Sequence, residues 1–461
     1  MIINLAERAH NHNWELDPVI RSLLDTDFYK LLMLQFIWKH FPKTQVAFSL
    51  FNRHPSVRMG DIVHIDELKM QLQHVRGRRF RKSELVWLAG NTFYGHRGIF
   101  EPAFLEWLER DFRLSDYELH VRDGQIHLTF EGIWPETTMW ELYALAILDE
   151  LKTRAHLKTL SEFGLDILYA RAKTKLWSKI VRLRGVPDLS VGDFGTRRRH
   201  SFLWQEYVVV AMAANLGNNF IGTSNAYLAH KHDVEAIGTN AHEIPMVLAA
   251  LAKDDDELRE SQYRVLELWQ QTYEGALRVM LPDTFGTTQF LQGAPDWVAD
   301  WTGQRVDSKD PYAAGDEYID WLRERGRDPR EKLLIASDTL DVDIILGLHA
   351  YFGGALGKGM RPSDFQSAAD FYDQRKWTPG RRLRVSAGWG TLLTNDFRGC
   401  NPNDGGGFDP ISLICKVSSV EGRPAVKLSD NYAKALGPEK EIERYRRVFG
   451  TVGVANTPVL A

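Results

Sequence analysis

Seven times along the chain, an apolar stretch ends in glycine, aspartate, serine or threonine, and a helical pattern follows. Alternating strands and helices favour a parallel sheet covered by helices, and this many repeats favour a closed or nearly closed barrel. In such a barrel the carboxyl ends of the strands converge on one face, where ligands bind. We therefore expect residues far apart in the sequence to meet at that face. The expected strand ends are 192–197, 220–225, 237–242, 280–284, 304–308, 333–338 and 383–391.

One of these repeats, residues 234–248, combines a short apolar run, a polar turn and a long apolar segment. We expect a strand, a turn and a helix, with Pro245 in the first helical turn, where proline is tolerated. His242 lies at the turn, where a side chain can face a ligand bound at a helix N-terminus. Taken alone, His242 is better explained as a helix-start residue, because ordinary histidines far outnumber catalytic ones. Its significance depends on the other strand ends.

Those strand ends carry groups that bind phosphate and sugar. Backbone N–H groups and hydroxyls beside helix N-termini bind phosphate without a formal charge. Arg197 and Arg305 are suited to bidentate contacts with phosphate or carboxylate. Asp283, Asp307 and Asp338 are suited to sugar hydroxyls or Mg²⁺. The combination predicts a site for a phosphorylated small molecule.

The first 135 residues follow a different pattern, which is typical of an α+β unit. We expect a helix starting near residue 25, with Asp25 or Thr26 as its N-cap, and a strand at 45–51. Helical spacing dominates 60–112, and 117–131 is typical of a hairpin that turns at Asp123-Gly124. Another helix is expected from Trp134-Pro135.

Length and charge restrict the classes of function. At 461 residues the chain exceeds one ordinary domain and accommodates a barrel and a second unit. Its 57 basic and 61 acidic residues give a net charge of −4, which does not favour nucleic acid. A basic cluster at 76–82 contains one aromatic residue, and we interpret it as a solvated surface. Nucleic-acid binding through this cluster remains the alternative from another class.

The sequence also favours a cytoplasmic protein. The two cysteines are too few for a disulfide framework or a multi-cysteine zinc site, and they fit a reducing compartment. The first 17 residues lack the basic start and apolar centre of a secretory signal. No apolar run approaches the roughly 20 residues that span a bilayer, so we expect no membrane association.

Six motifs in order along the chain resemble those of nicotinate phosphoribosyltransferase of the bacterial and fungal type. The resemblance runs from about residue 20 to residue 450. The motifs are LDTDFYK at 24–30, DFGTRRR at 193–199, FIGTSN at 220–225, GTNAHE at 238–243, RVDS at 305–308 and KLSD at 427–430.

The resemblance implies an irregular α/β barrel with an open-faced α/β domain built from both chain ends. The open-faced domain is expected at residues 15–135, with 400–450 returning to it. The barrel is expected at 136–399 and carries the active site. The chain departs from the family pattern at Lys309, where glycine is usual, and at Ala387-Gly388-Trp389-Gly390.

The resemblance also implies a reaction. Phosphoribosyl is transferred from phosphoribosyl pyrophosphate to the ring nitrogen of nicotinate, giving nicotinate mononucleotide and pyrophosphate for NAD synthesis. ATP hydrolysis is coupled to the transfer, so the enzyme is of the ligase type, and Mg²⁺ is the implied cofactor. The family histidine that matches His242 is phosphorylated by ATP. Neutral imidazole is a competent nucleophile near pH 7.

Individual roles follow from the same resemblance. Phe194 and Tyr29 match the aromatics that stack on nicotinate, and Arg197 and Arg305 match positions that meet its carboxylate or a phosphate. Asp283 and Asp307 match acids near the metal and the ribose. The expected phosphoribosyl and phosphate contacts are Thr223, Asp307, Ser308, Asp338, Gly388, Gly390 and Thr391.

Two further expectations concern the base and the oligomer. Relatives that use nicotinamide have an acid at the position of Ser224, and an acid there would repel the carboxylate of nicotinate. Serine therefore favours nicotinate, with nicotinamide or quinolinate as the alternative base. Relatives deliver the aromatic that matches Tyr29 from a neighbouring subunit, which would require a homodimer.

Overall fold

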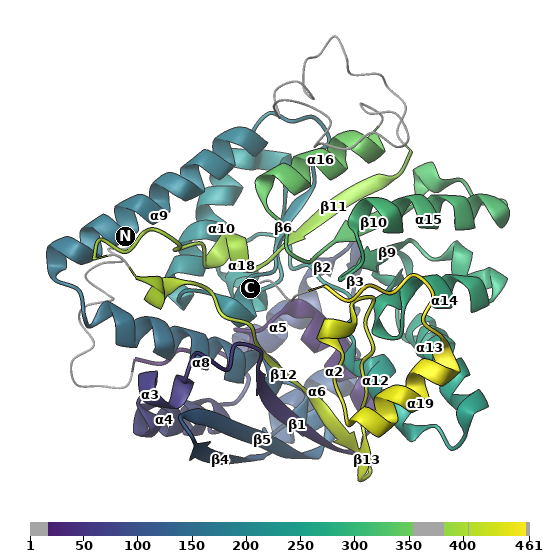
Figure 1. The fold of residues 1–461 in the computed structure, drawn as a ribbon, viewed down its shortest axis with the longest axis horizontal. Helices are drawn as coiled ribbons and strands as arrows, with labels where there is room; N and C mark the ends of the chain where they lie inside the picture. Colours follow the sequence, from purple (N-terminus) through teal and green to yellow (C-terminus); the bar gives the residue numbers. More distant parts are fainter. Residues whose placement is uncertain (1–16, 354–381, 404, 458–461) are drawn as a thin grey trace.

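Two sheets form the framework of the protein, whose computed structural model describes residues 17–353, 382–403 and 405–457 (Figure 1). One sheet has six parallel strands and the other has five antiparallel strands. The segment on which the expected absence of a secretory signal rests, residues 1–16, lies outside the described residues. Fold class is as expected: an α/β barrel architecture beside an open antiparallel sheet.

In the parallel sheet the last four strands lie side by side in chain order, and the last strand then pairs with the first. The first two strands are β6 (Val191–Asp193) and β7 (Phe220–Thr223). The others are β8 (Val279–Met280), β9 (Gly303–Val306), β10 (Leu333–Ala336) and β11 (Arg384–Trp389). Because β11 pairs with β6, the only break in the ring of described strands lies between β7 and β8. Six of the seven expected strand ends are therefore confirmed.

The seventh expected strand, before His242, was a wrong prediction. The segment makes only two backbone hydrogen bonds to β7, from Thr223 N–H to Glu235 O and from Ile237 N–H to Thr223 O, both 3.0 Å. Gly238 then adopts a φ of +136° and turns the chain away, passing the start of the Tyr29 side chain. The two hydrogen bonds form one isolated bridge, between Thr223 and Ala236, which is too short for a strand. The segment still fills the gap in the ring, and the predicted helix follows as α12 (Glu243–Leu251).

Helices cover the outside of the barrel (Figure 1). Helix α16 packs against β11 and α9, and α10 packs against β7 and α9. Their apolar faces are buried, which is the usual source of helix stability in such folds. The covering helices are α9 (Glu162–Leu183), α10 (Phe202–Leu216), α11 (Ala226–His232), α13 (Asp255–Thr272), α14 (Thr287–Gly293), α15 (Pro311–Glu324) and α16 (Val342–Gly353).

The antiparallel sheet brings the two parts of the chain furthest apart in sequence together. Strand β1 (Gln45–Asn52) lies between β12 (Leu413–Val420) and β5 (Gln125–Ile133). Strands β4 (Asp116–Arg122) and β13 (Arg423–Pro424) form the edges. The expected hairpin is confirmed: Asp123 and Gly124 have φ values of +52° and +73°, as a tight β-turn of this hand requires. The domain limits given above remain a proposal.

The N-terminal helices were expected, but their first boundary differs. Helix α2 (Phe28–His40) begins after Asp27, so the N-cap prediction at Asp25 or Thr26 was wrong. The Asp25 carboxylate instead binds Arg199 at 2.6 and 2.9 Å. The remaining helices on this side are α3 (Met59–Ile62), α4 (Ile65–Arg76), α5 (Lys82–Gly90), α6 (Pro102–Arg110), α7 (Trp134–Thr137) and α19 (Glu439–Phe449).

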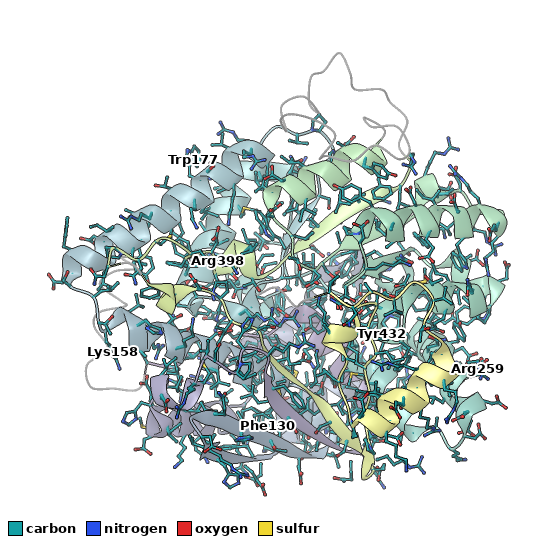
Figure 2. The ribbon with its side chains drawn as sticks, in the orientation of Figure 1. Phe130, Lys158, Trp177, Arg259, Arg398 and Tyr432 are labelled. Atoms are coloured by element: carbon teal, nitrogen blue, oxygen red, sulfur yellow. The ribbon has the colours of Figure 1, made fainter. Side chains whose placement is uncertain are left out.

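Helix α8 (Trp140–Leu157) joins the two sheets. It packs against β12 on one side and against the turn at Thr196–Arg198 that follows β6 on the other. Its side chains from Trp140 to Arg154 are all buried, and Trp140 stacks on Phe130 of β5 with ring centres 4.5 Å apart. Phe130 marks this contact in the lower sheet of Figure 2. Within the described ranges, no helix is long and apolar enough to cross a membrane.

Candidate active site

A cavity of about 550 Å³ runs along the parallel strands to their carboxyl ends, and residues of the antiparallel sheet also line it. The barrel and both chain ends contribute to its wall. Ten of the residues predicted from the sequence line it: Tyr29, Phe194, Arg197, His242, Arg305, Asp307, Asp338, Gly388, Gly390 and Thr391. This convergence is what a parallel barrel predicts for residues at its strand ends.

Two aromatic side chains line the cavity near its arginines. Phe194 follows β6, and its N–H donates to the carbonyl oxygen of Trp389 at 2.8 Å. Gly388 leaves room for the ring, because a Cβ there would lie 3.2 Å from Phe194 Cδ2. Tyr29, from the first turn of α2, lines the cavity of its own chain. Tyr29 and Phe194 of one chain therefore line the same cavity, while delivery of the Tyr29 aromatic from a neighbouring subunit stays a prediction.

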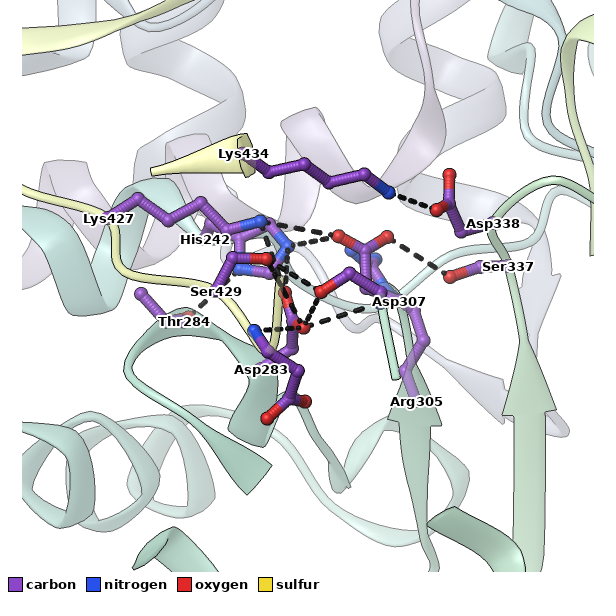
Figure 3. A network of polar contacts seen from close by, with 12 residues as sticks. His242, Asp283, Thr284, Arg305, Asp307, Ser337, Asp338, Lys427, Ser429 and Lys434 are labelled. Atoms are coloured by element: carbon purple, nitrogen blue, oxygen red, sulfur yellow. Dashed lines mark hydrogen bonds and ion pairs between the residues drawn. The ribbon is translucent and has the colours of Figure 1, made fainter. Parts of the chain in front are cut away.

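His242 lies in a polar network at one end of the cavity (Figure 3). Its Nδ1 is 2.9 Å from Thr284 Oγ1, and its Nε2 is 2.9 Å from Asp307 Oδ2. A carboxylate only accepts hydrogen bonds, so Nε2 carries the proton and Nδ1 accepts from Thr284. Burial and the nearby Lys427 lower the pKa of His242 to about 4. The imidazole is therefore neutral near pH 7.

Lys427 is the cation of this network. Its Nζ lies 3.1 Å from Asp283 Oδ2 and 3.4 Å from Asp307 Oδ2. Burial alone would raise the pKa of Asp307, but Lys427, His242 and Arg305 hold it well below its usual range. Asp307 is thus ionised, and its side chain keeps 20% exposure towards the cavity.

Asp283 is more completely enclosed than Asp307. Its carboxylate accepts from Asp430 N–H at 3.1 Å, from the Ser308 hydroxyl and from the Ser429 hydroxyl. The side chain is fully buried and does not line the cavity. Its oxygens are therefore already occupied by protein donors.

The donor set fits a hard cation, with Asp307 as the accessible ligand. One ligand atom each from His242, Asp283 and Asp307 lies within 4.8 Å of the others. Lys427 already sits between the two carboxylates, so a metal reaches only the cavity side of Asp307. Mg²⁺ commonly binds proteins through one or two carboxylates, completing its shell with water and phosphate. Metal binding by Asp283 and Asp307 stays a prediction, and of the two carboxylates only that of Asp307 lines the cavity.

Cationic side chains missed by the sequence reasoning line the cavity. Arg53, Lys416 and Lys434 come from the antiparallel sheet and the segments around it, where the local pattern gives no sign of a site, whereas Arg384 begins β11 and Arg198 lies in the turn after β6. Burial, followed by Arg197, lowers the pKa of Arg198 to about 10, and Lys434 pairs with Asp338. The missed cations are Arg53, Arg384, Lys416 and Lys434, while Arg198 and Lys427 were seen only as parts of motifs.

Three other predicted contacts lie behind the cavity wall. Thr223 donates to Asp193 at 2.7 Å, and Ser308 is engaged by Asp283. Ser224 is fully buried, and its hydroxyl donates to Asp27 Oδ1 at 2.6 Å. These hydroxyls support the wall rather than face a ligand. Asp27 is the acid that lines the cavity here, and burial raises its pKa.

Comparison with known families agrees with this geometry. The model of the nicotinate phosphoribosyltransferase (NAPRTase) family matches residues 189–452, more than half of the chain. The chain belongs to the nicotinate phosphoribosyltransferase family. The model of the family's N-terminal domain matches residues 24–149. Together the two matches cover the barrel and the antiparallel sheet.

Solved structures from the same family share the fold. A nicotinate phosphoribosyltransferase from Vibrio cholerae is 28% identical, with a TM-score of 0.76 over 94% of each chain. One from Porphyromonas gingivalis is 24% identical, with a TM-score of 0.75 over 94% of this chain and 100% of the other. A putative one from Saccharomyces cerevisiae is 22% identical, with a TM-score of 0.75 over 95% and 99% of the two chains.

Proposed function

We propose that the protein transfers phosphoribosyl from phosphoribosyl pyrophosphate to nicotinate, forming nicotinate mononucleotide and pyrophosphate, with ATP hydrolysis coupled through a phosphohistidine at His242. One observation carries the proposal: a neutral His242 contacts Asp307 at the end of a cation-lined cavity in a member of this family. In a cell, the reaction would supply NAD synthesis in the cytoplasm.

The phosphoryl step uses groups already in contact. The neutral imidazole is the nucleophile towards the terminal phosphoryl group of ATP, through Nδ1, the ring nitrogen that carries no proton. An N–P bond forms as the bond to the ADP oxygen breaks, and positive charge develops on the ring. Asp307, 2.9 Å from Nε2, stabilises that charge. The new phosphate brings negative charge near Lys427, which changes the net charge of the site before the phosphoribosyl transfer.

Substrate binding is assigned by charge and shape. Tyr29 and Phe194 sandwich the nicotinate ring, which contributes about 0.5–1.5 kcal/mol beyond area burial and so mainly orients the ring. Arg197 and Arg305 receive its carboxylate. Arg53, Lys416 and Lys434 receive the phosphates, and their clustering favours polyphosphate over a single phosphate.

Mg²⁺ would be held by Asp307 together with substrate phosphates, where it withdraws charge from the pyrophosphate as that group leaves. The transition state resembles an oxocarbenium ion, and the buried carboxylates beside it favour that positive charge. Asp338 and the backbone at Gly388 and Gly390 line the same cavity, and we assign them to the ribose and its 5′-phosphate.

Nicotinamide or quinolinate remains the alternative base. Arg197 and Arg305 in the cavity favour nicotinate, an acid, over nicotinamide, an amide. Quinolinate has a second carboxylate, which would have to face the carboxyl group of Asp27. Turnover of the three bases by the purified protein separates them. Nicotinate is expected to be fastest, and faster turnover of nicotinamide would refute this assignment.

Incubation with ATP labelled at its terminal phosphate tests the mechanism. Wild type is expected to take up acid-labile, base-stable phosphate, as phosphohistidine does, and His242→Ala is expected to take up none. His230→Ala, at a half-buried position on α11, is the matched control and should behave as wild type. No uptake by wild type, or equal uptake by His242→Ala, would exclude the phosphohistidine.

A further inference from the structure

A small hairpin from the N-terminal part of the chain contacts the segment that leads to His242. It consists of β2 (Thr92–Phe93) and β3 (His96–Arg97), joined by Tyr94 and Gly95. Both residues line the cavity. The sequence reasoning assigned helical structure to this region and gave the hairpin no role.

The Tyr94 hydroxyl hydrogen-bonds both backbone polar groups of Gly238, the N–H and the carbonyl oxygen. The hydroxyl donates to the Gly238 carbonyl oxygen at 2.9 Å and accepts from the Gly238 N–H. The backbone N–H of Tyr94 donates to Glu235 Oε1 at 3.0 Å. In a regular sheet a neighbouring strand would make such contacts. Here one phenol satisfies both groups of the residue at which the seventh barrel segment leaves β7.

The hairpin is fixed well enough to act as a support. Phe93 is fully buried, and its ring lies 4.7 Å from that of Phe28 and 5.1 Å from that of Trp87. Phe28 is the residue before Tyr29, so the hairpin also abuts the start of α2. Tyr94 itself has a φ of +53°, an unusual conformation for a bulky residue that the surrounding contacts must hold.

Gly238 needs such support because its neighbours cannot hold it by regular pairing. It has a φ of +136°, and an added Cβ would lie 3.1 Å from the Tyr29 Cβ. It lies four positions before His242, whose two ring nitrogens each contact a partner at 2.9 Å. A small shift at Gly238 therefore moves the imidazole relative to Asp307 and Thr284.

We propose that Tyr94 is a positioning residue for His242: its hydroxyl fixes Gly238, and through it the loop that presents the imidazole to its phosphoryl donor. The inference rests on the proposed function of His242. Tyr94 is assigned no contact with the reacting atoms, because its hydroxyl is already engaged by Gly238 in both directions.

Tyr94→Phe tests the proposal, since it retains the ring and removes both hydrogen bonds. Displacing a reacting group by a fraction of an ångström to 1 Å costs roughly tenfold to 100-fold in rate. We expect phosphate uptake and kcat for nicotinate mononucleotide to fall by roughly tenfold or more, while KM for nicotinate changes by less than about threefold. Tyr117→Phe is the matched control, because the Tyr117 hydroxyl accepts only an exposed hydrogen bond from Gln73 among those found, and it should match wild type.

Two results would overturn the proposal. A lower melting temperature with unchanged kcat would make the contact purely structural, and a raised KM with unchanged kcat would make Tyr94 a substrate contact. If Tyr94→Phe does not fold, Glu235→Ala removes the other anchor of the hairpin, and kcat must fall or the proposal fails. If wild type takes up no phosphate, the phosphohistidine fails, and Tyr94 is judged by kcat for nucleotide formation alone.

Discussion

Two networks of buried charges lie close together in this protein and differ in their balance. The core network consists of Lys30, Glu141, Glu243 and Lys416. Lys30 contacts both glutamates, at 2.7 Å for Glu141, and Lys416 also contacts Glu141. Two cations therefore meet two anions, and the charges cancel.

The site network consists of His242, Asp283, Asp307 and Lys427, shown in Figure 3. One cation meets two carboxylates, and the histidine is neutral. Among the contacts of the described residues, this network keeps one negative charge in excess, on the side that faces the cavity. A substrate-bound Mg²⁺ would supply the missing charge.

The two networks adjoin in sequence, since Glu243 directly follows His242. Glu243 also accepts from the indole N–H of Trp134, so α12 is fixed at its first residue. The difference in balance indicates different tasks. The core network fixes the start of α12, the helix that directly follows His242. The site network instead keeps a negative charge that its own residues do not cancel.

The largest effect is expected from breaking the core network with Lys30→Met. The change leaves Glu243 without its cation and Glu141 with only Lys416, in a fully buried place. Removing one partner of a buried pair costs about 3–5 kcal/mol of the free energy of unfolding, measured by urea denaturation. Lys39→Met breaks an exposed pair with Glu101 and should cost at most about 1 kcal/mol. Equal losses of the free energy of unfolding in Lys30→Met and Lys39→Met would show that the core network contributes no more stability than an exposed ion pair.

Breaking the site network with Asp307→Asn is expected to separate activity from stability. Lys427, His242 and Arg305 hold the pKa of Asp307 well below its usual range, so its charge stabilises the fold and its loss should lower the free energy of unfolding. The loss should be smaller than that of Lys30→Met, because Lys427 stays paired with Asp283. Phosphate uptake and nucleotide synthesis should fall by roughly 100-fold, because the charge that is proposed to stabilise the imidazolium ring and to bind Mg²⁺ is lost. A fall in melting temperature as large as that of Lys30→Met would contradict the difference drawn between the two networks.

A smaller effect is expected from Asp149, a buried acid that belongs to neither network. One of its oxygens, Oδ2, has no hydrogen-bond partner in the described part of the chain, and burial raises its pKa to about 7. The folded state thus binds the proton more tightly, so this acid lowers stability as pH rises from about 4 to about 7. Asp149→Asn should remove that dependence and raise the free energy of unfolding at pH 8 by on the order of 1–3 kcal/mol. Parallel stability curves for the two proteins between pH 5 and pH 8 would rule this out.

The barrel was predictable because its signals are local. Each strand end carries turn residues beside an apolar run, and parallel geometry then brings Phe194, Asp307 and Asp338 to one face. The segment before His242 carries the same signals but is not a strand. What prevents it is the turn at Gly238 past Tyr29, a contact between residues more than 200 positions apart, which no local pattern records.

The cations of the cavity and the role of Ser224 were beyond sequence reasoning for a similar reason. Arg53 and Lys416 belong to antiparallel pairs whose alternation is ordinary, and their approach to the cavity depends on how that sheet lies over the barrel. Ser224 ends a strand as predicted, but residues 25–28 run beside it and place Asp27 between its hydroxyl and the cavity.

The pairing of β1 with β12 also sets the order in which the enzyme becomes competent during synthesis. A ribosome has made the barrel and His242 before it reaches Leu413, so the growing chain carries the histidine without Lys416, Lys427 or Lys434. Chains released before that point lack these three cations, of which Lys416 and Lys434 are proposed phosphate contacts. Under the proposed function, incomplete translation products are therefore expected to leave ATP untouched.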